Sequence, residues 1–136
     1  MSLTIHVGEA AFEIGSPSFL RSFYSTVFVR LEKHSWGSRF PTIMKELYAG
    51  ELVAASAGAA VAELATIAGE LRELEPTEVV WNHEDLSQTP PWGSNIAPSI
   101  TNMSEYFVTS DGRPLLDVLD AAFGEAARTG RPVCLC

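Results

Sequence analysis

The sequence predicts an α+β fold, with a small three- to four-stranded sheet and about four helices packed mainly on one of its faces. Apolar residues at three- and four-residue spacing predict long helices in the first and last thirds of the chain. Short alternating or apolar runs near both ends predict strands. The 136 residues argue for a single domain, 1–136, in which about two-thirds of the unfolded surface can be buried.

The first third of the chain is expected to hold a strand and then the best-specified helix. In residues 3–7, aliphatic and polar side chains alternate, as in a half-buried strand. Ser16 is a good N-cap, and Pro17 suits the first helical position, so a helix is predicted from Pro17 to about His34. Its apolar stripe consists of Phe19, Leu20, Phe23, Tyr24, Val27, Phe28 and Leu31.

Two further helices are expected in the middle of the chain. A short one begins at Pro41 and ends before Gly50, which is a favourable C-terminal stop. An alanine-rich helix is predicted over residues 57–74, and Pro76 follows its end. Because alanine allows close approach, this helix is expected to pack against the first one.

The next segment alternates between short apolar runs and irregular sequence. Residues 78–81 are predicted to form a strand, whereas residues 106–109 could form a strand or a helical turn, with a strand favoured. Between them, residues 82–102 show no periodicity. A loop of some twenty residues is unusual in a compact domain and is often functional.

The last segment is expected to form a helix and a final strand. The helix follows Pro114 and is closed by Gly130, and residues 132–135 form the strand. Cys134 and Cys136 share one face of that strand but stand too far apart for an unstrained disulfide. Two reduced cysteines in a buried strand fit a reducing compartment, and C-x-C is only half of a metal site.

The charge pattern favours a protein partner over a nucleic acid. The net charge is −8, and residues 51–111 carry ten acids and one base, Arg72. Residues 1–50 carry five bases and four acids. Phosphate binding needs Lys and Arg, whereas a field of one sign attracts a basic protein. Plain solubility is the alternative explanation of this charge.

The sequence predicts neither a membrane segment nor export. The uncharged stretch at residues 52–62 is too short and too rich in small residues to span a bilayer. The first residues show no basic region followed by an apolar run, so no signal peptide is expected.

His83, Glu84 and Asp85 form the one constellation that suggests catalysis. A small hydrolase or isomerase would use His83 with Glu84 or Asp85 in a cleft under the 82–102 loop. However, three adjacent residues cannot all aim at one point, and the spacing matches no metal or nucleophile motif. A solvated turn is therefore favoured, and neither an enzyme nor a cofactor is predicted.

Aromatic residues in irregular segments are candidates for binding. Trp36, Trp81 and Trp92 lie at or near such segments, and Arg39 lies close to Trp36. Trp and Arg are enriched among the residues that dominate interfaces. The alternative is that the rings fill the core beneath the loops. Burial is favoured for Trp81, whereas for Trp92 core and exposed anchor weigh equally.

Six motifs carry a resemblance that covers the chain from about residue 5 to its end. In order, they are Trp36-Gly-Ser-Arg-Phe-Pro41, Leu47-Tyr-Ala-Gly50, Glu63-Leu64 with Ile67 and Leu71, Val80-Trp81, Pro90-Pro-Trp-Gly93 and Tyr106-Phe-Val-Thr-Ser-Asp-Gly112. Together they resemble a small family of bacterial immunity proteins from polymorphic toxin systems. The resemblance implies a cytoplasmic protein that binds a cognate toxin domain and blocks it, without catalysis or cofactor. It transfers no contact residues.

The resulting hypothesis is that an acidic surface with aromatic anchors binds a basic toxin. A nuclease would suit, since nucleases must hold phosphates. The toxin-binding candidates are Trp36, Arg39, Glu70, Glu73, Glu84, Asp85 and Trp92. The sequence does not predict a homo-oligomer, and an accessory subunit that homodimerises is a third interpretation.

Overall fold

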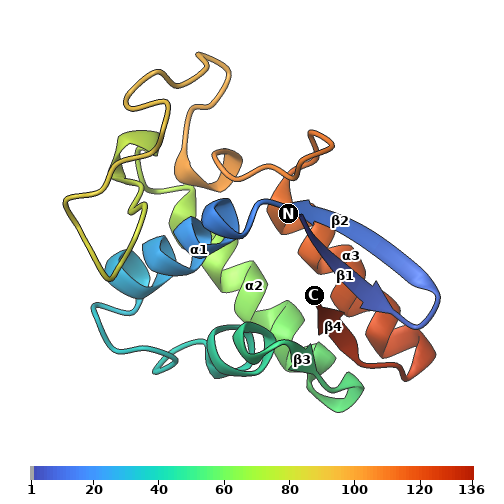
Figure 1. Cartoon of the computed structure of the whole chain (residues 1–136). Helices are drawn as coiled ribbons and strands as arrows, with labels where there is room; N and C mark the ends of the chain where they lie inside the picture. The colour runs from blue at the N-terminus through green and yellow to red at the C-terminus, as the bar shows by residue number, and fades with distance from the viewer. Residues whose placement is uncertain (1) are drawn as a thin grey trace.

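The computed structural model describes residues 2–136 and confirms the α+β fold (Figure 1). Its antiparallel four-stranded sheet has the order β2-β1-β4-β3. The strands are β1 (Leu3–Val7), β2 (Ala10–Gly15), β3 (Glu51–Leu52) and β4 (Val133–Leu135). Strands from opposite ends of the chain, β1 and β4, therefore lie side by side in the middle of the sheet.

Three α-helices and several shorter helical segments surround the core. The α-helices are α1 (Pro17–Thr26), α2 (Ala57–Leu71) and α3 (Leu115–Thr129). Two π-helical segments are η1 (Val27–Leu31), which continues α1, and η2 (Thr42–Leu47). The 3₁₀ segments are η3 (Ala54–Ser56), η4 (Pro76–Glu78) and η5 (Met103–Glu105).

One face of the sheet belongs to the core. Ile5 and Val7 of β1 are buried, whereas His6 between them is exposed, as strand alternation requires. Helix α3 packs on the buried face, and α2 packs against α3. The predicted packing of α2 against the first helix is present at η1, although α3 is the main partner of α2. Rings of α1 also contact Phe107.

The start of α1 matches the prediction. Ser16 is extended, and its hydroxyl accepts a hydrogen bond from the backbone N–H of Phe19 at 3.1 Å. Pro17 follows at the first helical position, where its missing N–H leaves no bond unmade.

Replacing Ser16 with alanine is expected to cost about 1 kcal/mol, because the N–H of Phe19 loses its acceptor. Urea denaturation of both proteins measures the difference. Ser18→Ala is the matched control, since Ser18 is an exposed serine of the same helical turn. Equal losses in the two variants would contradict a capping role for Ser16.

The first helix ends three residues earlier than the sequence predicts. Helical structure stops at Leu31, and Lys33 and His34 have φ values of 52° and 66°. This left-handed turn follows Glu32, whose side chain is buried and binds the backbone of the next loop. The helix therefore gives way to a turn that the carboxylate stabilises.

Strand predictions succeed at the chain ends and fail in the middle. Strands β1 and β4 were predicted, whereas β2 and β3 were not. The strand predicted at 78–81 is wrong, because this stretch pairs with α1 and not with a sheet. The N–H of Val80 donates to Thr26 Oγ1 at 3.0 Å, and its carbonyl accepts from Ser22 Oγ at 2.9 Å.

The strand predicted at 106–109 is also wrong. Residues 103–105 form η5, and Val108 makes only an isolated bridge with Pro114. The intervening segment 82–102 is irregular, as predicted (yellow to orange in Figure 1). It lies at the opposite end of the molecule from the sheet.

The two cysteines are free, but the strand does not bury them fully. Cys134 is half-buried and Cys136 is exposed, in contrast to the predicted buried pair. Their side chains belong to the outer face of the sheet, because Val133 next to them points inward. Partial burial raises the pKa of the Cys134 thiol, and the charges of Glu51 and Cys136 raise it further.

Candidate binding surface

A single buried carboxylate organises the loop after the first helix. Glu32 is only 3% exposed, and its oxygens accept hydrogen bonds from three backbone N–H groups. The donors are Gly37 at 2.9 Å, Arg39 at 3.1 Å and Phe40 at 3.1 Å. Glu32 was not among the site residues predicted from the sequence. Its place directly after Leu31, the last residue of the apolar stripe, could have indicated that it is buried.

Two carboxylates of α2 bind the chain between Arg39 and Ile43. Glu63 accepts hydrogen bonds from the N–H groups of Thr42 and Ile43 at 3.1 and 3.0 Å. Glu70 forms a two-pronged ion pair with Arg39, in which Nη1 lies 2.7 Å from Oε1. The hydrogen bond from Arg39 lowers the pKa of Glu70. The predicted toxin contacts Arg39 and Glu70 are therefore partners of each other.

Trp36 belongs to an aromatic cluster between η1 and the neighbouring loops. Its Nε1 donates to the carbonyl of Met44 at 2.7 Å, and its ring stacks on buried Tyr24. Phe28 and His83 also contact the ring, with centroids 5.2 Å away in both cases. Through His83, the structure brings Trp36 next to the predicted acidic pair at residues 84–85.

His83 faces a serine and not a carboxylate. Its Nδ1 lies 2.9 Å from Ser25 Oγ, which also accepts from the backbone N–H of His83. Asp85 accepts hydrogen bonds from Ser87 and Gln88, which lower the pKa of its carboxyl group. The enzyme alternative expected His83 to act with Glu84 or Asp85 in a cleft, and this arrangement lacks that geometry.

Trp92 lies between the core and solvent. Its side chain is 39% exposed, and its Nε1 donates to the hydroxyl of Tyr106 at 2.7 Å. The ring meets Phe19 and Trp81 edge-on, with centroids 5.4 Å apart in each pair. Half of the indole is thus fixed by packing, while the rest is available to a partner.

Two hollows flank the loop that carries Trp92. One, of about 320 Å³, is lined by Thr77, Val79, Leu86, Gln88, Thr89, Pro90, Gly93, Ser94 and Ile96. The other, of about 240 Å³, is lined by Phe19, Trp92, Asn95, Ile96, Ala97, Ile100, Tyr106 and Val108. We call the residues lining these two hollows the loop surface. Its apolar members Leu86, Ile96 and Val108 were not among the predicted site residues.

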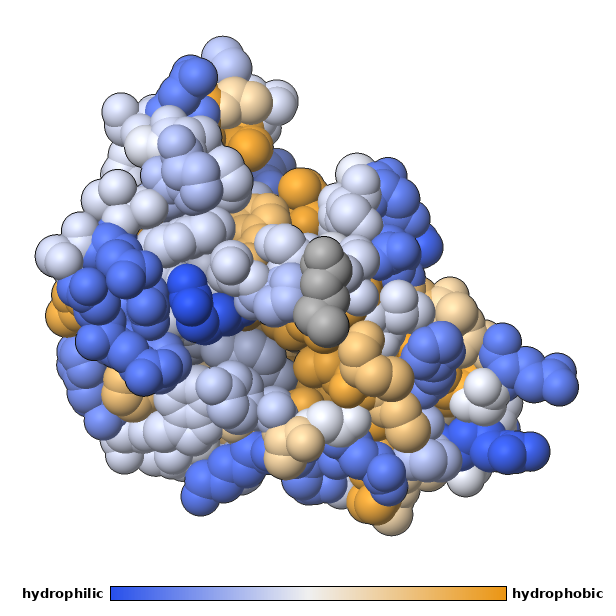
Figure 2. Space-filling model, in the orientation of Figure 1, coloured by the Kyte–Doolittle hydropathy of each residue, from blue (hydrophilic) through white to orange (hydrophobic). Residues whose placement is uncertain are grey.

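Carboxylates dominate the sequence around the loop surface. Between Arg72 and Arg113 the chain has seven acids and no lysine or arginine. Glu73, Glu84 and Asp85 are exposed. Figure 2 shows hydrophilic side chains gathered at the left edge of the molecule, where Figure 1 places the start of the 82–102 segment.

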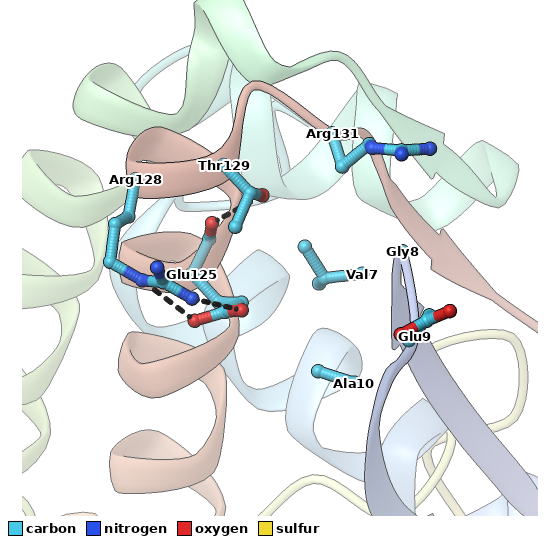
Figure 3. A pocket seen from close by; sticks show the side chains of 8 residues that line it. All are labelled: Val7, Gly8, Glu9, Ala10, Glu125, Arg128, Thr129 and Arg131. Atoms are coloured by element: carbon cyan, nitrogen blue, oxygen red, sulfur yellow. Dashed lines mark hydrogen bonds and ion pairs between the residues drawn. The ribbon is translucent and has the colours of Figure 1, made fainter.

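A larger hollow lies elsewhere and has a different character. It has a volume of about 770 Å³ and lies between the β1–β2 turn and the end of α3 (Figure 3). Two acids, Glu9 and Glu125, and two bases, Arg128 and Arg131, line it. Glu125 and Arg128 already pair with each other. None of the predicted site residues lines this hollow.

In residues 2–136, no cluster of three or more His, Cys, Asp or Glu side chains has a geometry that could hold a metal ion. In the same range, no helix is long and apolar enough to cross a membrane.

These features define a small α+β protein that exposes several carboxylates and a few aromatic and aliphatic side chains. The family model of Immunity protein 70 matches residues 5–135, which is nearly the whole chain. The chain therefore belongs to the Immunity protein 70 family, in agreement with the resemblance to immunity proteins. Comparisons with curated proteins and with solved structures found no match.

Proposed function

We propose that this chain is a single immunity-protein domain, 1–136, that binds a cognate toxin domain and neutralises it without catalysis or cofactor. The observation that carries the proposal is the family match over residues 5–135. The proposed setting is the bacterial cytoplasm, within a polymorphic toxin system. A basic toxin such as a nuclease suits the net charge of −8.

In this proposal the toxin contacts exposed acids and a half-exposed indole. Glu73, Glu84 and Asp85 pair with toxin cations, and Trp92 supplies an aromatic anchor. The other candidates, Trp36, Arg39 and Glu70, extend this surface toward the 36–41 loop. Their hydrogen bonds within the chain support a role in holding that loop in place.

Co-expression with the adjacent gene product tests the proposal. The C-terminal region of the polypeptide encoded immediately upstream is produced in a bacterial host, with and without this chain. We expect that region to stop growth alone and this chain to restore growth by forming a complex with it. A catalytically inactive toxin variant does not stop growth, so it can be produced and purified. It is expected to form the same complex and is used for the measurements on purified proteins. A harmless neighbour, or rescue without a complex, would overturn the proposal.

A further inference from the structure

We infer that the loop surface is the docking site for one toxin segment, which carries two apolar side chains with lysine or arginine beside them. The inference rests on the proposed function and describes the chemistry of the bound segment. It follows from three observations: the shape of the surface, its exposed apolar side chains and its charge.

The shape of the loop surface suits a partner that straddles residues 92–97. Ile96 lines both hollows, so the wall between them is a single stretch of chain. The volumes of about 320 and 240 Å³ leave room for one large side chain in each hollow. A segment with two apolar side chains can therefore place one on each side of this wall.

Exposed apolar side chains concentrate at the same place. Five large apolar side chains of residues 2–136 are strongly exposed, and three of them line the hollows. Leu86 is 61% exposed in the first hollow, while Trp92 and Val108 are 39% and 40% exposed in the second. Scattered exposed apolar residues need no explanation, but a group of them around hollows is typical of an interaction site.

The charge decides which partner fits. Glu84 and Asp85 directly precede Leu86, and Glu105 directly precedes Tyr106. Two bases contact segments that flank this surface: Arg30 Nε donates to the carbonyl of Glu78, and the carbonyl of Arg113 accepts from the N–H of Thr109, next to Val108. A basic segment gains attraction on approach, whereas a second copy of this chain would bring like charges together. The surface therefore favours a basic partner over self-association.

Hydrogen exchange on the purified complex maps the docking site. The probe is the catalytically inactive C-terminal domain of the adjacent gene product, added to the full chain. We expect slower amide exchange in residues 84–97 and 106–110, and little change in α3. Protection confined to other segments would overturn the inference while leaving the proposed function intact.

A matched pair of substitutions tests the same point by affinity. Leu86→Ser removes an exposed apolar side chain from the first hollow and should raise the Kd for the inactive toxin domain at least tenfold. Val53→Ser removes an exposed apolar side chain, 48% accessible, that lines neither hollow, and should change the Kd less than twofold.

The outcomes separate the inference from the function on which it rests. If both variants bind like the unmodified chain, the loop surface is not the docking site, although the protein still binds a toxin. If the unmodified chain forms no complex, the proposed function fails and the inference fails with it. Circular dichroism melting checks that both variants fold like the parent.

Discussion

Replacing Glu32 with alanine is expected to lower the free energy of unfolding by about 3–5 kcal/mol. Its carboxylate is buried and satisfies the N–H groups of Gly37, Arg39 and Phe40. Each backbone donor left buried without an acceptor costs about 1–3 kcal/mol, and the lost side chain leaves a void as well. For a chain of this size the melting temperature should fall by roughly 10–20 °C.

Two controls show whether the lower free energy of unfolding comes from the N–H groups that are left without an acceptor. Glu73→Ala removes an exposed carboxylate and should change stability by less than about 0.5 kcal/mol. Glu32→Gln keeps one acceptor oxygen and should fall between the parent and Glu32→Ala. A loss below about 1 kcal/mol for Glu32→Ala in urea denaturation would contradict the proposed role of this carboxylate.

The double reversal Glu73→Lys and Glu84→Lys is expected to slow association with a basic toxin roughly tenfold or more at low salt. Both side chains are exposed, and no hydrogen bond of either carboxylate within the chain is described, so the fold should be preserved. The field at the proposed surface would weaken because two negative charges become positive, which shifts the net charge by about four units. Stopped-flow association with the inactive toxin domain at several salt concentrations measures the effect.

The control for this prediction changes the net charge equally at another place. The control variant combines Glu9→Lys, in the turn between β1 and β2, with Asp120→Lys, in α3. Both acids are exposed, and neither lines the loop surface. It should slow association much less, because steering depends on charge near the contact within about 10 Å. Equal slowing by both pairs would mean that net charge, and not this surface, governs association.

Helices were predictable wherever an apolar stripe and a terminal signal agreed. Ser16-Pro17 and Gly130 mark the ends of α1 and α3, and both signals act within a few residues. The exact end of the first helix was not predictable, because it depends on the burial of Glu32. That burial requires the tertiary fold around the following loop.

Strands were harder to predict because their partners are distant in the chain. Strand β2 has the sequence Ala-Ala-Phe-Glu-Ile-Gly, whose alternation is poor, and it forms only because β1 lies beside it. Residues 78–81 show the opposite case: they have strand-like side chains, but hydroxyls of α1 bind Val80 instead. Local preference for strand was outweighed in both cases by contacts made elsewhere.

The candidate site was predictable in chemistry more than in geometry. The acidic composition and the irregular 82–102 segment could be seen in the sequence. For Trp92 the sequence left core and exposed anchor open, and the structure places the ring between the two. The two hollows could not, because they join residues from α1, η4 and the loop around Ile96. The pairing of Arg39 with Glu70 likewise joins residues 31 positions apart.

The placement of β4 between β1 and β3 has a consequence for the order of folding. Val133–Leu135 is the strand that joins the N-terminal hairpin to β3, yet it is synthesised after almost all of the chain. Contacts between such distant segments form slowly, because a long loop must close first. Until β4 has been synthesised, β1 and β3 cannot be joined. The sheet is therefore completed only after β4 has left the ribosome, and helical contacts such as that between α2 and α3 can form before it.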